Sequence, residues 1–453
     1  MPGQRPSHQA GVRAHVPLDR DAVQRVVSRL RTDPGRASIR EMNRLVSAIE
    51  QECGVRFVRM EFGIPGLPVP AIAIEAERDA LGRQGVGHVY APFVGIPELK
   101  TEAARFVKLF LDVDVPPACC IPTVGAMQGC FASILLASRM REVPGKILFL
   151  DPGFPVNKLQ VRLLGIDWDH IDFYDFRGDD LVRAIDERAS RGDVSGVLWS
   201  SPNNPSWISL DDRELRGIGE VCDRHALIAI EDMAYFGMDT RTDYLTPGEP
   251  PYQPTVLRHT KRAITLVSSS KIFSYAGQRI ALAIVSPELM DAEQPALERY
   301  YGTANVGHAF VHGGLYPITA SVPESPQYGL LALLRAANDG DKGVFAPAHE
   351  YSRRANIMKR LFLDHGFRLV YDNDLGRPLA DGFYFTISYP GFDRGADLLR
   401  ELLHYGISAI TLATTGSRRL EGLRACVSMV GDEQFPELQE RLERFRTDHP
   451  VAG

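Results

Sequence analysis

The sequence predicts an α/β protein, with a mainly parallel sheet in a large domain and a smaller α+β domain. Three observations support this prediction. Short apolar runs alternate with helical stretches between about residues 146 and 285, polar clusters follow four of these runs, and the pattern changes after about Pro317. Because parallel strands are joined through crossover helices and are covered on both faces, apolar runs that alternate with helices indicate a parallel sheet.

The N-terminal part of the chain is predicted to be helical before the sheet begins, after about ten disordered residues. Helices are expected at 19–30 and 37–52, and apolar residues recur in the second at the spacing of a packed helix: Ile39, Met42, Leu45, Val46 and Ile49. The prolines and glycines of 61–70 exclude a helix or a central strand. This segment is either a functional loop or a domain connector. A further helix is expected at 71–88.

Residues 121–140 combine a turn of small residues with an apolar helix that is expected at 130–140. The N-terminus of a helix offers free backbone N–H groups and the positive end of the helix dipole, so this turn could bind an anion. Taken alone the signal is weak, because every helix has an N-terminus.

Five apolar runs are predicted to be buried strands of the sheet, at 146–150, 196–199, 227–230, 263–267 and 280–285. Helices near 155–164, 179–191 and 211–225 separate the first of them. Polar clusters follow four strands, at 151–154, 200–205, 231–235 and 268–271. Ligands of open α/β sheets bind outside the C-terminal ends of the strands, so the four clusters are expected to converge on one cleft.

The C-terminal part of the chain mixes helices with strands. Helices are expected at 325–337, 346–363, 394–405 and 437–446, and strands near 367–371, 382–388 and 423–429. The predicted division is an N-terminal segment 1–75 that contributes to the small domain, a large domain 76–320, and a small domain 321–453.

The composition is that of an ordinary globular protein, with 453 residues, 44% hydrophobic and 24% charged. A net charge of -6 gives no reason to expect nucleic acid or an anionic membrane as a partner. No apolar run approaches the ~18 residues that span a bilayer, and the N-terminus lacks the apolar core of a secretory signal. Six irregularly spaced cysteines without a CxxC pattern do not predict a disulfide framework. These features predict a reduced cytoplasmic protein.

Lys271 is the foremost candidate for a reactive residue. It follows the apolar run 263–267 in Ser268-Ser269-Ser270-Lys271, and Arg279 comes eight residues later. Partial desolvation and a nearby positive charge lower the pKa of a lysine and make it a suitable Schiff-base amine. The alternative is a lysine in a surface loop.

These motifs, in this order, resemble those of the fold type I pyridoxal-phosphate enzymes, specifically the class I/II aminotransferases, from about Phe62 to about Val430. The resemblance implies a seven-stranded sheet, pyridoxal 5'-phosphate as cofactor, and a homodimer with active sites at the subunit interface. Lys271 would form the internal aldimine. Asp232 would pair with the pyridine nitrogen, because a carboxylate that holds the ring proton makes the cofactor an electron sink.

The same resemblance implies the other cofactor contacts. Tyr235, a third catalytic candidate, and Asn204 would hydrogen-bond the phenolic oxygen, and Phe154 would stack on the ring. The phosphate would be held by the backbone amides of Ala126 and Met127, by Ser268, Ser270 and Arg279, and by Tyr90 of the other subunit. Arginine suits this task because its planar fork binds oxyanions in a bidentate manner. Each residue also has a plainer interpretation, Asp232 and Tyr235 as ordinary strand-end residues and Phe154 as core.

On the substrate side, Arg424 matches the arginine that grips an α-carboxylate, although such an arginine alone is more often part of a surface ion pair. The chain departs from the family at several places, and Gln278 stands where the family commonly has an aromatic residue. Ser206-Trp207 replaces Thr-Gly, so that Trp207 either packs or narrows the cavity, and Ile64-Pro65-Gly66 replaces a Gly-Glu-Pro-Asp loop. The predicted substrate contacts are Arg424, Asn204, Ile64, Trp207 and His308.

His308 closes a loop, 300–308, that lies where dicarboxylate-specific members of the family carry an arginine. The loop has no arginine at its centre, which argues weakly against aspartate or glutamate as the preferred substrate. His308 and His312 are spaced i, i+4, but no third ligand motif accompanies them, so no metal site is predicted.

The predicted function is that of an aminotransferase, which exchanges an amino group between an amino acid and a 2-oxo acid through the Lys271 aldimine and a quinonoid. The freed Lys271 amine would remove the α-proton. The alternative keeps the cofactor but leads to β/γ-elimination, replacement or C–C bond formation, for example on an S-adenosylmethionine-like amino acid. A binding protein with an inactive fold is disfavoured, because Lys271, Asp232 and Arg424 are all present. The sequence does not name the amino donor or acceptor.

Overall fold

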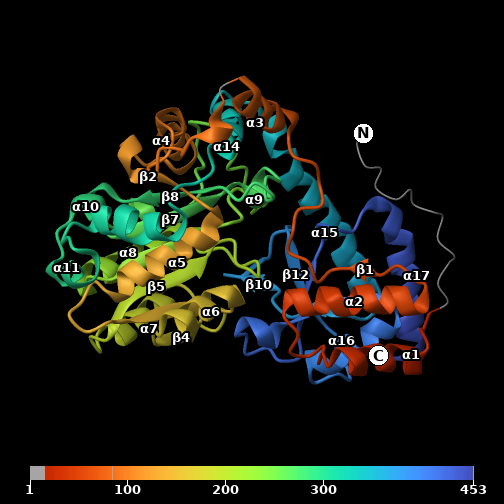
Figure 1. Cartoon of the computed structure of the whole chain (residues 1–453). Coiled ribbons are helices and arrows are strands. Elements are labelled where there is room, and N and C mark those ends of the chain that lie inside the picture. Colours follow the sequence, from red (N-terminus) through yellow and green to blue (C-terminus); the bar gives the residue numbers. More distant parts are fainter. Residues whose placement is uncertain (1–15, 84, 452–453) are drawn as a thin grey trace. The chain divides into compact units, whose positions relative to one another are not determined.

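The computed structural model describes residues 16–83 and 85–451, and the disorder predicted for the first ten residues lies outside them. The described chain divides into two compact units (Figure 1). The larger unit comprises Ile64–Arg353 and Asp372–Gly382. The smaller unit is built from both ends of the chain, up to Gly63 and from Phe383 onward, together with Arg354–Tyr371.

The larger unit is organised around a seven-stranded sheet with the strand order β2-β8-β7-β6-β5-β3-β4. The strands are β2 (Cys120–Thr123), β3 (Lys146–Asp151), β4 (Trp168–Asp172), β5 (Val194–Ser200), β6 (Ile228–Met233), β7 (Ala263–Ser268) and β8 (Ala281–Val285). Neighbours from β7 to β4 run parallel, whereas β8 is antiparallel to both β7 and β2. The predicted mainly parallel α/β fold is confirmed.

All five predicted strands are present, and the two that sequence patterns missed lie at the edges of the sheet. β2 contains Pro122 and follows two further prolines, a composition that strands tolerate only at an edge. β4 is only partly buried, so it lacks the continuous apolar run of the central strands. Every residue of β5 to β8 is buried, which means that both faces of the sheet are covered.

The helices of the larger unit flank this sheet. They are α3 (Ala71–Arg83), α4 (Pro97–Leu111), α5 (Gly125–Ser138), α6 (Pro155–Leu164), α7 (Asp179–Ala189), α8 (Asp212–His225), α9 (Ser269–Ile272), α10 (Pro287–Asp291), α11 (Glu298–Tyr301), α12 (Val306–His308), α13 (Tyr316–Thr319) and α14 (Glu324–Asn338). Helix α5 packs across β5 to β8. It begins at Gly125 rather than at the predicted residue 130, and the Gln128 side chain accepts the Val124 N–H at 2.6 Å across its first turn.

Helix α14 belongs to the larger unit, although residues 321–353 were expected in the small domain. Its buried leucines pack it against α3 and α4. A two-stranded hairpin, β10 (Asn373–Asp374) and β11 (Arg377–Pro378), also belongs to the larger unit and was not predicted.

The smaller unit combines helices with an antiparallel sheet of strand order β14-β15-β12-β9. These strands are β14 (Ile410–Thr411), β15 (Leu423–Cys426), β12 (Tyr384–Ser388) and β9 (Arg368–Leu369), and a separate parallel pair joins β1 (Val58–Arg59) to β13 (Ile407–Ser408). The main helices are α1 (Arg20–Leu30), α2 (Ile39–Cys53), α16 (Gly395–His404) and α17 (Phe435–Asp448). Helix α15 (Ala346–Asp364) continues from the larger unit into this one.

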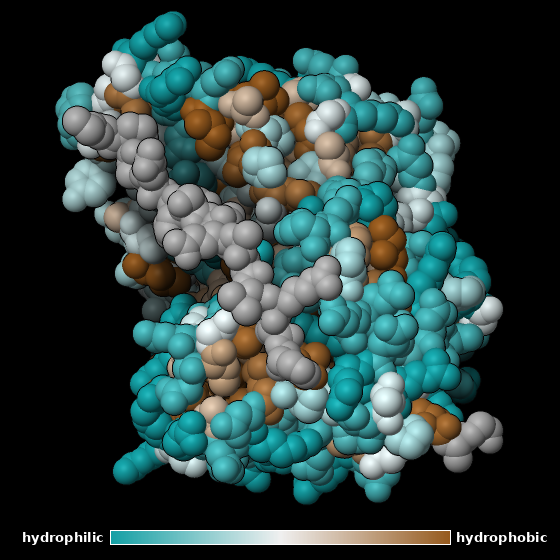
Figure 2. Space-filling model, turned by 90° about the vertical axis from the view of Figure 1, so that its right-hand side faces the viewer, coloured by the Kyte–Doolittle hydropathy of each residue, from teal (hydrophilic) through white to brown (hydrophobic). Residues whose placement is uncertain are grey.

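The predicted stripe of α2 is buried at Met42, Leu45, Val46 and Ile49. The helix starts with a capping box, in which Ser38 and Glu41 satisfy each other's backbone N–H groups. On the face of the molecule drawn in Figure 2, hydrophilic side chains predominate and hydrophobic ones gather in a few separate places. Within 16–83 and 85–451 no helix has the length and hydropathy to cross a bilayer.

Candidate active site

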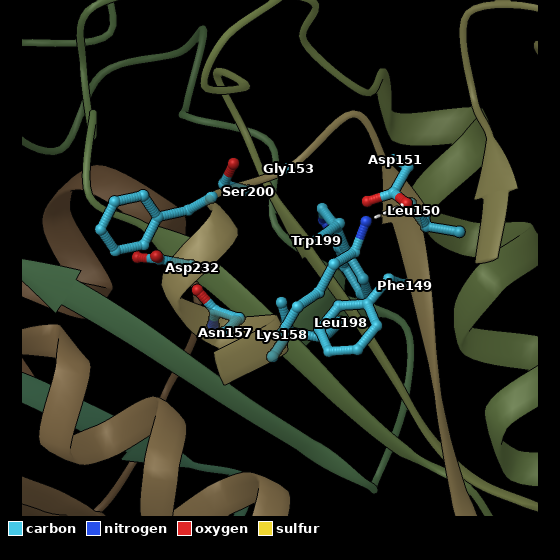
Figure 3. Close-up of a pocket in the computed structure, with 11 residues that line it drawn as sticks. Phe149, Leu150, Asp151, Gly153, Asn157, Lys158, Leu198, Trp199, Ser200 and Asp232 are labelled. Atoms are coloured by element: carbon cyan, nitrogen blue, oxygen red, sulfur yellow. Dashed lines mark hydrogen bonds and ion pairs between the residues drawn. The ribbon is translucent and has the colours of Figure 1, made fainter. Parts of the chain in front are cut away.

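The C-terminal ends of β3, β5, β6 and β7 meet at one edge of the sheet, because these strands are parallel neighbours. The register places Asp232 opposite Ser200 on one side and Leu266 on the other. Asp151, Ser200 and Asp232 line one pocket, together with residues of α6 (Figure 3). Three of the four predicted strand-end clusters therefore contribute to one pocket, whereas no residue of 268–271 is among its lining residues.

Asp232 is a buried carboxylate at the end of β6. Its Oδ1 accepts one backbone hydrogen bond, from Ala234 N at 3.0 Å, and no cation among the described residues pairs with it. Burial therefore raises the pKa of Asp232 to about 7. A protonated ring nitrogen would supply the missing positive charge, so this carboxylate fits the predicted pyridine partner.

Lys271 lies on α9, a single turn that starts directly where β7 ends. The Ser268 hydroxyl caps this turn and accepts a hydrogen bond from Ser270 N at 3.2 Å. Ser269 donates its hydroxyl to Ile280 O at 2.7 Å, which fixes the turn to the residue that precedes β8. The lysine side chain is half-buried on this anchored turn.

The N-terminus of α5 forms a cradle for an anion. Gly125 has a φ of 68°, and no side chain caps the first turn, which contains Ala126 and Met127. A Cβ atom on Gly125 would lie 2.4 Å from Arg279 Nη2, so the guanidinium lies directly against the helix end. First-turn N–H groups have no acceptor within the helix. Together with the arginine and the buried hydroxyls of Ser268 and Ser270, they fit a phosphate group.

The Asn-Asn-Pro turn connects two of the strand ends through Asn203. Its side-chain amide donates to Pro152 O at 2.9 Å, and its Oδ1 accepts from Ser206 N at 3.0 Å. Asn204 is buried, and its backbone N–H donates to Ser200 Oγ at 3.4 Å. The family motif indicated Asn204 but not Asn203. The two adjacent asparagines could have indicated a role for Asn203 as well, because an amide side chain can both donate and accept hydrogen bonds and so close a turn.

Tyr235 is buried and meets Trp207 edge to face, with ring centroids 5.2 Å apart. Trp207 is itself 1% exposed. The packing alternative for Trp207 is therefore the one that the structure adopts, and the predicted substrate contact is not supported because the indole presents almost no surface to a ligand.

Phe154 is the N-cap residue of α6 and lines the pocket near Asp232. Asn157 and Lys158 of α6 line it as well and were not predicted (Figure 3). Lys158 Nζ pairs with Asp151 Oδ2 at 2.5 Å, although burial still raises the pKa of Asp151. Asn157 follows Phe154 by three residues, and this helical spacing could have indicated that both reach one pocket.

Of the predicted site residues, Phe154 and Asp232 line this pocket. Some of the others have exposed side chains. Tyr90 is 91% exposed and Ile64 is 46% exposed. His308 is exposed and stacks on His312 with centroids 4.3 Å apart. Burial, followed by the charge of His308, lowers the pKa of His312. No group of three or more His, Cys, Asp or Glu residues that could hold a metal occurs in the described part of the chain.

Arg424 lies in β15 of the smaller unit and is 1% exposed, which excludes the alternative of a surface ion pair. Its Nη2 donates to Glu61 O at 2.8 Å, and its guanidinium carbon lies 4.5 Å from the centre of the Tyr384 ring. The guanidinium therefore lies against a backbone carbonyl and an aromatic face, and an arginine can stack on such a face.

The sequence of the chain is similar to that of known proteins of one family. The family model described as aminotransferase class I and II matches residues 61–315. The aspartate aminotransferase of Pyrococcus horikoshii is 22% identical over 90% of this chain and 94% of its own length. The probable aspartate aminotransferase of Methanocaldococcus jannaschii is 28% identical over 51% of this chain, and the match spans 58% of that protein.

A solved structure shares the fold across nearly the whole chain. The aspartate aminotransferase of Thermus thermophilus with maleate superposes with a TM-score of 0.71, covers 93% of this chain and 98% of its own, and is 21% identical. The matched segment 61–315 contains the cradle, the Asn-Asn-Pro turn, Asp232 and Lys271. The chain belongs to the aminotransferase class I and II family.

Proposed function

We propose that the protein is a pyridoxal-phosphate-dependent aminotransferase, which moves an amino group between an amino acid and a 2-oxo acid. The observation that supports this most directly is the buried Asp232 carboxylate, which has no cationic partner among the described residues. It lies at the same sheet edge as the turn that carries Lys271. A negative charge held in this way is stabilised by a protonated ring nitrogen.

The cofactor would bind in the larger unit. Asp232 would hold the ring nitrogen, Phe154 would pack on the ring, and the α5 cradle with Arg279 would hold the phosphate. Pyridoxal phosphate, when bound, withdraws electrons from the substrate α-carbon. The geometry of the cradle supports this assignment, because Gly125 leaves room for Arg279 against the helix end.

The side chains of the protein would then carry the proton and the substrate. Lys271 Nζ would attach the cofactor and, once displaced by the substrate amine, would take the α-proton. Tyr235 and Asn204 would hydrogen-bond the phenolic oxygen. Arg424 would bind the substrate carboxylate, and this role stays a prediction from its position in the motif.

The alternative reaction is elimination, replacement or C–C bond formation, and one of the two observations that favoured it no longer does. It was motivated by Trp207 and by the loop 64–66, and Trp207 is buried packing. Incubation with candidate amino acids separates the two reactions. We expect a 2-oxo acid in step with amination of the cofactor, whereas release of a leaving group without amination would favour the alternative.

The experiment that tests the cofactor assignment is borohydride reduction of the purified protein followed by peptide mapping. We expect the label on Lys271 and its loss in Lys271→Ala. Lys158→Ala is the matched control, because Lys158 is the lysine that lines the pocket of Asp232; the label should stay on Lys271 in this variant. A label on Lys158, or none after reconstitution, would contradict the proposal.

We also propose a cytoplasmic homodimer in which Tyr90 reaches the phosphate site of the other subunit. The 91% exposure of the Tyr90 side chain supports this, because an exposed tyrosine is available to a second copy. Light scattering of the holoenzyme should give twice the 50.2 kDa mass of the chain. A monomer that retains full cofactor affinity would contradict the proposal.

A further inference from the structure

Trp207 has a backbone conformation that residues with side chains rarely adopt. Its φ is 64°, in the left-handed region, and its side chain is 1% exposed. This conformation costs of the order of 1–2 kcal/mol for a residue that is not glycine. A large aromatic residue adopts this conformation only when contacts of its side chain compensate for the strain. The contacts of the Trp207 indole are therefore the ones that hold this conformation in place.

The indole is enclosed between Tyr235 and Gly382. The ring of Tyr235 lies 5.2 Å away at an interplanar angle of 65°, which is the edge-to-face arrangement that aromatic pairs favour. On Gly382, a Cβ atom would lie 2.1 Å from both Cε2 and Cζ2 of the indole. Only glycine allows this approach, so the missing side chain at 382 and the large one at 207 are complementary.

Both ends of this arrangement are anchored. Trp207 N donates to Asn203 O at 2.9 Å, within the turn that Asn203 and Ser206 close through their side chains. The carbonyl of Asp381, next to Gly382, accepts from the Thr240 hydroxyl at 2.9 Å. The indole is therefore confined, and the Tyr235 ring that it touches is confined with it.

We infer that Trp207 is a positioning residue, which seats the Tyr235 ring so that its hydroxyl donates to the phenolic oxygen of pyridoxal phosphate. This inference rests on the proposed function. A donor to that oxygen stabilises the negative charge there and weakens its hold on the proton of the neighbouring Lys271 nitrogen. Loss of the donor geometry should therefore raise the pH at which this proton leaves.

The test is a pH titration of the visible absorbance of the holoenzyme. We expect Tyr235→Phe and Trp207→Gly each to raise the midpoint by about one pH unit, and the double variant to shift it no further than Tyr235→Phe alone. Trp168→Phe is the control for loss of a tryptophan, because Trp168 lies in the edge strand β4; its midpoint should equal that of the wild type.

A second readout needs no cofactor. In the apoenzyme, Tyr235→Phe should lose the near-ultraviolet circular dichroism of the confined Tyr235 phenol. Trp207→Gly should lose this signal together with that of the indole, so the double variant should lose no more than Trp207→Gly alone. If Trp207→Gly does not fold, Gly382→Ala takes its place, since the added methyl group displaces the indole and leaves Trp207 itself unchanged; its midpoint should rise as well.

The outcomes separate the two proposals. A wild-type protein in which borohydride labels no Lys271 overturns the proposed function and this inference with it. A wild-type protein that is labelled at Lys271, and whose midpoint is unchanged by Trp207→Gly or Gly382→Ala, overturns the inference alone and reduces Trp207 to a space-filling residue.

Discussion

Glu231 and Asp232 are adjacent carboxylates of β6, and successive residues of a strand point to opposite faces of a sheet. Burial raises the pKa of each to about 7. Their partners differ. Glu231 Oε2 accepts from Thr255 Oγ1 at 2.6 Å and from Thr265 Oγ1 at 3.2 Å, whereas Asp232 has one backbone donor. Glu231 is therefore held within the fold, and Asp232 is left with capacity for a ligand.

The pKa of Glu231 gives a stability prediction for the apoenzyme. The pKa in the folded state is raised from 4.5 to about 7, so the folded protein loses stability relative to the unfolded chain as the pH rises through this window. Glu231→Gln resembles the protonated acid, because its amide oxygen can take the place of Oε2. We expect this variant to match the wild type near pH 4 and to be more stable by about 3 kcal/mol at pH 8.

Urea unfolding of the apoenzyme at pH 4 and pH 8 measures this difference. If the free energy of unfolding of Glu231→Gln differed from that of the wild type by the same amount at pH 4 and at pH 8, Glu231 would not be held protonated by its surroundings.

The variant Asp232→Asn tests whether the negative charge of Asp232 is needed for catalysis, because it removes the charge and keeps a buried polar side chain of similar shape. Asparagine has a similar shape but cannot balance a proton on the cofactor ring, so we expect kcat to fall on the order of 10²-fold or more. Glu231→Gln is the matched control, a neighbouring buried carboxylate on the opposite face, and it should keep kcat within a few-fold of the wild type. If both variants lost activity equally, burial and folding rather than the ring nitrogen would explain the effect.

At the scale of elements, the anion cradle at the N-terminus of α5 can be tested by comparing two glycines that have the same backbone conformation. Gly125 has a φ of 68° and faces Arg279 Nη2, whereas Gly165, at the C-cap of α6, has a φ of 67° and open space around it. Alanine at either position costs about 1 kcal/mol for the left-handed backbone. Only Gly125→Ala also pushes the guanidinium away from the helix end.

We therefore expect Gly125→Ala to raise the dissociation constant for pyridoxal phosphate at least tenfold, and Gly165→Ala to leave it unchanged. Calorimetric titration of the apoenzyme measures both constants. Equal constants for the two variants would show that the guanidinium is not needed at the helix end.

The elements that sequence patterns located are those whose signal is local. Strands β5 to β8 are buried on both faces, so each gives a continuous apolar run. The polar residues that follow the parallel strands β5, β6 and β7 lie at the predicted sheet edge. Edge strands β2 and β4 give no such run. The start of α5 depends on Gln128, whose side chain closes a turn that its residue type alone does not predict.

The contacts that sequence patterns missed depend on residues distant in the chain. The resemblance marked Trp207 as a departure, but its burial depends on Gly382, which is 175 positions away by the residue numbers. Asn203 acts through Pro152. Such pairs have no periodicity for a pattern to detect. The order of the motifs, by contrast, was enough to indicate the family, since each motif follows a strand of one sheet.

At the scale of the whole molecule, the chain returns to the larger unit for a single segment, Asp372–Gly382, between two stretches of the smaller one. Asp374, 1% exposed, holds this segment through two arginines. Its Oδ1 lies 2.6 Å from Arg177 Nη1, and its Oδ2 lies 2.6 Å from Arg241 Nη2. Each arginine has a second buried carboxylate, Glu214 for Arg177 and Asp239 for Arg241.

Asp374→Asn leaves two partly buried arginines without one of their partners, and removal of one member of a buried ionic network costs about 3 kcal/mol or more. We expect a loss of this size in urea unfolding, together with faster proteolysis within 372–382. Asp180→Asn is the control, because the Asp180–Arg183 pair is exposed and should contribute less than about 1 kcal/mol.

Since Gly382 ends the held segment, Asp374→Asn should also loosen the indole of Trp207 and raise the absorbance midpoint of the holoenzyme. A destabilised variant with an unchanged midpoint would show that Thr240 and the Asn203 turn hold the indole without the ionic network.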